Sequence, residues 1–124
     1  MARILETAAA LLLATTLASP TMAADAVAGA KNFKQACAVC HATATSGIGP
    51  ALGGIVGRKA GTLPGYASRY SPAMKAAGFV WTHEKLEHYI DNPASVVPGN
   101  HMPYAGMHNL VQADAVVDYL QTLK

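Results

Sequence analysis

The two cysteines of the chain lie three residues apart, and a histidine follows the second one directly. The motif consists of Cys37, Cys40 and His41, and the sequence contains no further cysteine. A disulfide between Cys37 and Cys40 would close a very short loop, so it would constrain little of the unfolded chain. A zinc ribbon or finger requires a second cysteine pair and is excluded, whereas a mixed site with histidines is not. A thioredoxin-like dithiol requires a βαβ context, and the residues before Cys37 have a helical pattern instead.

Covalent attachment of a haem is the remaining interpretation of this motif. Two thioether bonds would join Cys37 and Cys40 to neighbouring vinyl groups of the porphyrin, and His41 would reach the iron from one face. The close spacing suits this chemistry, because the two thiols must meet two adjacent groups on one edge of the ring. The sequence therefore predicts one covalent haem c, with its iron, and His41 as an axial ligand.

The N-terminal residues have the composition of a secretory signal peptide. Arg3 is followed by an apolar run of about a dozen residues, with small residues at the expected cleavage site after Ala23 or Ala24. The run is shorter than the roughly 20 apolar residues that a transmembrane helix needs. We expect residues 1–24 to be a cleaved signal peptide and residues 25–124 to form one periplasmic domain, with a retained N-terminal anchor as the alternative. Export also implies an oxidising compartment, in which a free thiol pair would not persist.

The charge of the chain is close to balanced, with a formal net charge of +2 at neutral pH. Arg3 and Glu6 cancel within the expected signal peptide, so its removal leaves the net charge unchanged. The sequence contains no block of lysines and arginines, and nucleic acid is therefore not expected as a partner.

Four segments have the pattern of a helix, and no alternating strand pattern longer than a few residues is present. Capping residues and apolar spacing mark where each helix begins. We expect the first three to be capped by Asp25, Ser71 and Thr82, and the last to begin at Leu110 or Ala113. The predicted fold class is therefore all-α, with the helices joined by long loops.

Two irregular segments, 42–70 and 93–106, are rich in glycine and proline and have no sustained apolar period. Such loops are uncommon in a compact domain unless they are functional or disordered. A buried haem accounts for them, because the loops can wrap around the ring. Gly29 is a further irregularity, since glycine inside a helix costs about 1 kcal/mol relative to alanine. Either the first helix is weakened there, or another backbone packs close to it.

A second axial ligand is expected among the methionines and histidines, because haem iron takes Met, His, water or another ligand on its other face. Met102 is far along the chain from His41, in a loop that Pro98 and Pro103 stiffen, and such a loop can hold a weak ligand in place. We expect Met102 as the distal ligand, with Met107 as the fallback. The other candidates are assigned to the core or the surface: Met74, His83, His88, His101 and His108.

The segments around these residues resemble, in their order and motifs, the class I cytochromes c. The matching pieces are GAKNFKQACAVCH, GIGPALGGIVGRKAG, SPAMKAAGFVW, LEHYIDNPASVVPGNHMPYAG and VVDYLQTLK. They span essentially all of residues 25–124, and the likeness is nearest to the periplasmic bacterial, mitochondrial-like monohaem members. The resemblance implies the cytochrome c fold, with about four to five short helices and long loops wrapped round one covalently bound haem.

The resemblance also implies roles for further residues. The Pro50 carbonyl would fix the ring N–H of His41, and Asn100 and Tyr89 would lie near the sulfur of Met102. Gly29 and Phe33 match the crossing of the first and last helices, against Val116 and Tyr119. The positions at which the family hydrogen-bonds the haem propionates hold Arg58, Trp81 and either Tyr66 or Tyr70.

Two features depart from the family pattern. Three residues separate Tyr66 from Tyr70 where the family commonly has one, which leaves open which tyrosine reaches a propionate. Mitochondrial members also surround the exposed haem edge with lysines. The matching positions here hold Ala36, Ala94, Ser95 and His101, so the docking face is expected to lack a positive field.

The function that follows is that of a soluble periplasmic electron carrier, not an enzyme, because both axial positions are filled and no small-molecule substrate need bind. The expected partners are redox proteins of a respiratory or photosynthetic chain, such as a quinol-oxidising complex, a terminal oxidase or a periplasmic dehydrogenase. The protein is expected to be a monomer. The main alternative is a cytochrome c subunit of a periplasmic oxidoreductase complex, and a haem protein with an open sixth site is a further one.

Overall fold

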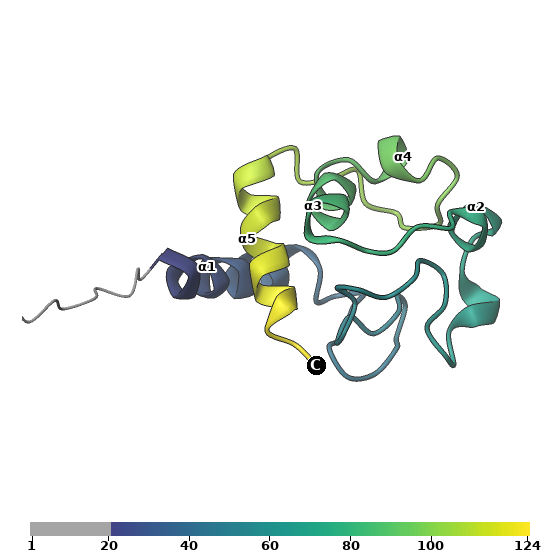
Figure 1. The fold of residues 1–124 in the computed structure, drawn as a ribbon, viewed down its shortest axis with the longest axis horizontal. Coiled ribbons are helices and arrows are strands. Elements are labelled where there is room, and N and C mark those ends of the chain that lie inside the picture. The colour runs from purple at the N-terminus through teal and green to yellow at the C-terminus, as the bar shows by residue number, and fades with distance from the viewer. Residues whose placement is uncertain (1–20) are drawn as a thin grey trace, which may run out of the picture.

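The computed structural model describes residues 21–124 as a set of short helices joined by long loops (Figure 1). No strand occurs in this part of the chain, and the only β-type pairing is an isolated bridge between Lys59 and Val80. The prediction of an all-α fold is therefore confirmed. The helices are α1 (Thr21–Ala36), η1 (Ala67–Arg69), α2 (Pro72–Ala76), α3 (His83–Asp91), α4 (Pro93–Val96) and α5 (Leu110–Gln121).

Helices α1 and α5 cross each other and join the two ends of the domain (Figure 1). Gly29 lies at the crossing, where a Cβ atom would collide with the carbonyl oxygen of Ala115. One turn further along, the rings of Phe33 and Tyr119 lie 5.4 Å apart. Of the two explanations for Gly29, close approach of another backbone is therefore the right one, and its partner is Ala115 of α5.

The start of α1 differs from the prediction. Helix α1 already includes Thr21, the first described residue, so Asp25 lies inside the helix and does not cap it. The physical reason is that Met22, Ala23 and Ala24 all favour the helical conformation, so the helix extends to the N-terminal side of Asp25. The predicted signal peptide lies outside the described residues, apart from the first turn of α1.

Helices α2 and α3 begin as their capping residues predict. The Ser71 hydroxyl accepts a hydrogen bond from the Met74 amide at 3.0 Å, and the Thr82 hydroxyl accepts one from the Lys85 amide at 3.1 Å. Helix α5 begins at Leu110, and its cap is Asn109, whose side-chain oxygen accepts a hydrogen bond from Gln112. Side-chain caps of this kind satisfy amides that have no partner within the helix.

The segment predicted to be irregular after α3 contains the helix α4, so that part of the prediction is wrong. Pro93 occupies its first position, where a missing N–H is no loss, and the four residues are too few to show an apolar period. The loop between α1 and α2 likewise contains the short helix η1. Within the described residues, no helix is long and apolar enough to cross a membrane.

The loop that follows α1 is held by backbone hydrogen bonds between segments distant in sequence. The amide of Gly53 donates to the Thr43 carbonyl at 2.7 Å, and the amide of Ala60 donates to the Phe79 carbonyl at 2.9 Å. These bonds take the place of a sheet, and they fix the loop as one wall of the interior. The largest fully buried side chains come from other elements, and they include Val116 and Val117 of α5.

Candidate functional site

A cavity of about 380 Å³ occupies the interior between the loops and the helices. Such a volume is within the range of sites that hold a cofactor or a drug-sized ligand. The wall is mostly apolar, and five of the described helices or their flanking residues contribute to it. Its buried apolar members include Phe33, Ile55, Met74, Leu86, Val116 and Leu120.

The cysteine motif lies in the turn that follows α1, and all three of its residues line the cavity. The amides of Cys40 and His41 both donate to the Cys37 carbonyl, at 3.1 and 2.9 Å, so the turn brings the three side chains to one region of the wall. The two thiols are free. Burial, together with the neighbouring Cys40, raises the pKa of Cys37 to about 11, so this thiol stays protonated at neutral pH. A reactive redox thiol requires a lowered pKa, and burial shifts the pKa of Cys37 in the opposite direction.

The imidazole of His41 is fixed from two sides. Its Nδ1 lies 2.8 Å from the Pro50 carbonyl oxygen, and because that oxygen can only accept, Nδ1 carries the proton. Gly49 packs against the ring so closely that a Cβ there would lie 2.5 Å from Cε1. The amide of Gly49 in turn donates to the Cys40 carbonyl at 2.8 Å, which binds this segment to the cysteine turn. Nε2 is then the nitrogen left to bind a metal.

Another part of the wall is the loop that contains Met102. The amide of Met102 donates to the side-chain oxygen of Asn100 at 2.9 Å, and the Asn100 amide group donates to the Val97 carbonyl at 3.0 Å. Asn100 therefore positions the backbone of Met102. His101 also lines the cavity, whereas Met107 does not.

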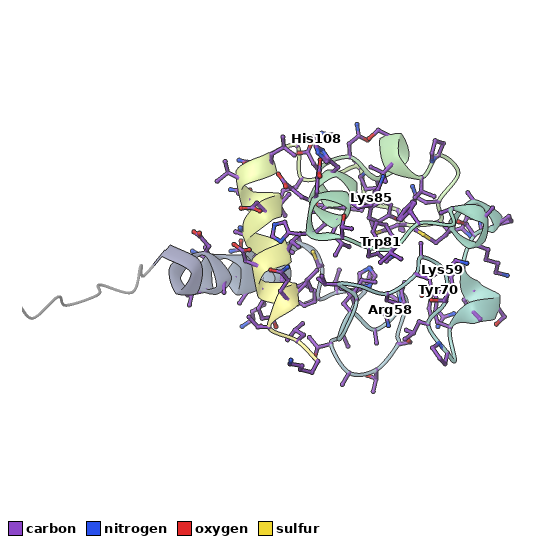
Figure 2. All side chains as sticks on the ribbon, viewed as in Figure 1. Arg58, Lys59, Tyr70, Trp81, Lys85 and His108 are labelled. Atoms are coloured by element: carbon purple, nitrogen blue, oxygen red, sulfur yellow. The ribbon has the colours of Figure 1, made fainter. Side chains whose placement is uncertain are left out.

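An aromatic cluster forms the part of the wall contributed by α3 and the segment before it. The Trp81 ring packs against those of Phe79 and Tyr89, with centroids 4.8 and 4.9 Å apart, and Trp81 lies near the middle of the molecule in Figure 2. Burial raises the pKa of Tyr89 to about 12, so its hydroxyl remains neutral. Lys85 covers the outer side of the cluster, with its ammonium 5.0 Å from the Phe79 ring centre.

The two tyrosines of the loop have different surroundings, although both line the cavity. The hydroxyl of Tyr66 donates to the Ile48 carbonyl at 2.8 Å. Tyr70 meets the Tyr66 ring edge-on at 4.9 Å. Burial raises the pKa of Tyr70, and a backbone hydrogen bond with Leu63 and then the Arg58 charge oppose this shift.

Arg58 is the one predicted site residue that does not line the cavity. Its guanidinium donates to the Ala51 carbonyl at 3.2 Å, behind the wall, and burial lowers its pKa. In Figure 2 it lies beside Tyr70, on the loop side of the molecule. The structure therefore brings together all the predicted site residues except Arg58: Cys37, Cys40, His41, Pro50, Tyr66, Tyr70, Trp81, Tyr89, Asn100 and Met102.

Three of the wall residues that the sequence did not assign to the site are informative. Gly49 is concealed in a glycine-rich loop, and only its contact with His41 distinguishes it. Arg69 donates to the carbonyls of Gly47 and Ile48 and stacks on the Tyr66 ring at 4.5 Å, which no sequence pattern indicates. Met74, assigned to the core, is buried and also lines the cavity.

Comparison with known proteins bears on this arrangement. Residues 26–124 match the family model described as cytochrome c. The chain belongs to the cytochrome c family. Its relatives include the cytochrome c2 of Rhodomicrobium vannielii, which is 42% identical over 108 residues, covering 85% of this chain and 84% of the relative. The cytochrome c2 of Blastochloris viridis is 38% identical over 113 residues, covering 89% and 86%.

A solved structure shows the same architecture. Cytochrome cH from Methylobacterium extorquens superimposes with a TM-score of 0.70 at 35% identity, covering 79% of this chain and 98% of that one. The chain therefore has the class I cytochrome c fold, binds haem c with its iron, and carries electrons. The cavity fits this cofactor, because its wall is mostly apolar and holds two free thiols, a methionine, and a histidine whose Nδ1 is hydrogen-bonded to a backbone carbonyl.

Proposed function

We propose that this cytochrome c carries single electrons between periplasmic redox proteins, with His41 and Met102 as axial ligands and with Cys37 and Cys40 as the thioether anchors. The observation that carries the proposal is the orientation of the His41 imidazole. Its Nδ1 is hydrogen-bonded to the Pro50 carbonyl, in a cavity wall that also holds Met102. The bound haem supplies a reversible one-electron couple between ferric and ferrous iron.

The residues of the wall tune this couple. The Pro50 carbonyl raises the basicity of His41 and fixes its orientation, and Asn100 holds the backbone of Met102. The apolar wall excludes water and lowers the local dielectric, which disfavours the more highly charged ferric state. A soft methionine sulfur also favours the ferrous state. Both effects raise the reduction potential, and a fixed wall keeps reorganisation small.

Tyr70 is the better candidate for a propionate contact. The Tyr66 hydroxyl already donates its only proton to the Ile48 carbonyl. The backbone hydrogen bond of Tyr70 with Leu63 lowers the tyrosine pKa, so the phenol oxygen accepts it and the proton of Tyr70 is left for another acceptor. Arg58 lies behind the wall and acts on Tyr70 through its charge, so we assign it an indirect role. Trp81 lies on the wall, where its indole N–H is the natural second donor.

The proposed location is the periplasm, with residues 1–24 as the cleaved signal peptide. The apolar run after Arg3 supports this, as do relatives that are bacterial cytochromes c2. Purification from the periplasmic fraction should yield a chain whose mass, after subtraction of one haem, begins at Ala24 or Asp25. A mass that retains residues 1–20 would support the anchored alternative.

The proposed partners are redox proteins, such as a quinol-oxidising complex, a terminal oxidase or a periplasmic dehydrogenase, and no enzymatic activity is proposed. The exposed residues at the edge of the cavity, here called the cavity rim, include Val39 and Ile48, and they support contact with a largely uncharged protein surface. Val39 and Ile48 line the cavity and are also 80% and 65% exposed. Arg69 is the only lysine, arginine, aspartate or glutamate that lines the cavity in the described chain.

One spectroscopic experiment tests the assignment of ligands and function together. The purified protein should give a reduced-minus-oxidised spectrum of a low-spin haem c, and the oxidised form should show the Met–iron charge-transfer band. Carbon monoxide should not bind the reduced protein at neutral pH. Binding of carbon monoxide would point to an open sixth position and would overturn the carrier proposal.

A further inference from the structure

A second cluster of potential ligands lies outside the cavity, where α3 meets α5. His83, the first residue of α3, points one ring nitrogen at each of two carboxylates of α5. Its Nε2 is 2.5 Å from Oδ1 of Asp114, and its Nδ1 is 3.9 Å from Oδ1 of Asp118. One ligand atom from each of the three residues lies within 4.8 Å of the other two.

The arrangement concentrates negative charge on one face. Asp114 and Asp118 are four residues apart on α5, so their carboxylates lie side by side, and like charges in this relation repel. Partial burial, then the charge of Asp114, raises the pKa of Asp118, and Asp25 of α1 adds to the effect. A cation between the carboxylates would relieve this repulsion.

A protonated His83 would offset only part of the negative charge of Asp114 and Asp118. Partial burial lowers its pKa, but its hydrogen bonds and the charges of Asp114 and Asp118 outweigh that effect, so the net shift is upward. Hydrogen bonds with Asp114 and Gln121 already tie His83 to α5, whereas Asp118 faces the imidazole only through its charge, from 3.9 Å. A nearby pair on the same helix provides a contrast, since His88 and Glu84 are both exposed and lie 4.0 Å apart, with no third ligand among residues 21–124.

We propose that His83, Asp114 and Asp118 form a binding site for a borderline divalent cation, of which Zn²⁺ is the probe, and that the bound ion links α3 to α5. A ring nitrogen with two carboxylates suits Zn²⁺ or Cu²⁺, whereas Ca²⁺ and Mg²⁺ favour all-oxygen sites. Zn²⁺ bonds of about 2.0–2.2 Å place tetrahedral ligands about 3.3 Å apart. The three side chains are half-buried, so small torsional changes bring their ligand atoms to this separation, and water completes the shell.

The site is separate from the haem cavity, although both use α5. Val116 and Leu120 of α5 line the cavity, whereas Asp114 and Asp118 alternate with them along the helix and do not. An ion bound by His83 and the two aspartates is therefore expected to stabilise the fold without changing the environment of the haem. Zinc binding at this site and electron transfer by the haem can therefore be tested independently of each other.

Thermal unfolding of the haem-loaded protein with and without Zn²⁺ tests the inference. Zinc at a large excess over its dissociation constant should raise the Tm by about 5 °C or more, because only the folded state holds the three ligands together. Magnesium at the same concentration should have no comparable effect. Below the unfolding transition, addition of zinc should leave the visible spectrum unchanged.

Two variants and one control test the assignment of His83 and Asp118 as ligands. His83→Gln and Asp118→Asn should each remove most of the Tm rise, and calorimetric titration should show at least a tenfold loss of zinc affinity. Asp118→Asn is the safer of the two, because its carboxylate is already disfavoured in the folded protein and its loss should leave the domain folded. The matched control is His88→Gln, which removes an exposed histidine of the same helix and should keep the full effect. An equal Tm rise in wild type and both ligand variants, or none in wild type, would overturn the inference.

Discussion

The backbone of Gly49 lies against the imidazole of His41, in the same segment whose next residue, Pro50, accepts the Nδ1 hydrogen bond. The position a Cβ would take at residue 49 is within 2.9 Å of three atoms of that ring, so only glycine fits there without a shift. Two neighbouring residues thus fix the orientation of the proposed proximal ligand, one by its carbonyl oxygen and the other by its lack of a side chain.

Substitution of Gly49 by alanine should displace the His41 ring and weaken the hydrogen bond to Pro50. We expect the free energy of unfolding to fall by about 1–3 kcal/mol, as overpacking of a tight site does. The reduction potential should fall as well, because the ligand geometry changes. Chemical denaturation and redox titration measure the two effects. Gly47→Ala is the matched control, because a Cβ there meets nothing closer than 3.8 Å, and it should behave as wild type.

Substitution of Asn100 by alanine should loosen the Met102 loop, since it removes both the bond to the Met102 amide and the bond to Val97. Loss of such partners costs about 1–3 kcal/mol, and the Met–iron charge-transfer band should weaken or vanish at a lower pH or temperature than in wild type. Asn109→Ala is the control, since it removes the cap of α5 at about 1 kcal/mol. The control should lower the Tm and leave the band intact, and equal loss of the band in both variants would contradict a specific role for Asn100.

Replacement of Met102 by alanine should recruit His101, the neighbouring histidine that also lines the cavity. We expect a low-spin bis-histidine spectrum and a potential lower by about a tenth of a volt or more, within the range of about 0.8 V that axial ligands span. The double variant with His101→Ala should be high-spin. A high-spin spectrum with an open site in the single variant would show that His101 does not reach the iron.

Reduction and oxidation by physiological partners should depend weakly on salt, because Val39 and Ile48 on the cavity rim are exposed and apolar. Between about 0.01 and 0.1 M ionic strength the Debye length falls from about 30 to about 10 Å. Over this range we expect the bimolecular rate constant to change less than about threefold, whereas steered pairs change far more. Stopped-flow measurements test this, and Val39→Lys should introduce a salt dependence that wild type lacks. A steep decrease in wild type would indicate a charged docking face elsewhere.

His83 should stabilise the folded domain in a pH-dependent way, even in the presence of EDTA. Its pKa is raised in the folded state, so its contribution is complete below the unfolded value of about 6.5 and is lost as the pH rises through the folded value. The Tm difference between wild type and His83→Gln should therefore shrink from about pH 6 to about pH 9. His88→Gln should show a smaller difference at every pH, since its partner is exposed and 4.0 Å away. A difference that grows with pH would reverse the assigned sign.

The residue patterns of the sequence predicted mainly those features that depend on residues within about one helical turn of each other. The family resemblance added two longer-range contacts that the structure shows, the Pro50 carbonyl on His41 and the crossing of Gly29 with the last helix. The caps Ser71 and Thr82 were predicted correctly, because a hydroxyl satisfies an amide three residues away whatever the rest of the chain does. The spacing of Cys37, Cys40 and His41 likewise predicted haem attachment, because these three residues are also close together in the sequence. The assignment of Met102 to the iron stays a prediction, with its place on the cavity wall in its support.

Only the tertiary structure decided which distant segments meet. It placed Arg58 behind the wall, formed the hydrogen bond from Tyr66 to the Ile48 carbonyl, and brought His83 to two carboxylates some thirty residues away. Such contacts depend on how helices and loops pack around a shared interior, and no local pattern records that packing. A motif of neighbouring residues, such as Cys37, Cys40 and His41, can thus be recognised from the sequence. The residues that surround this motif come from distant segments, and they are brought together only when the chain folds.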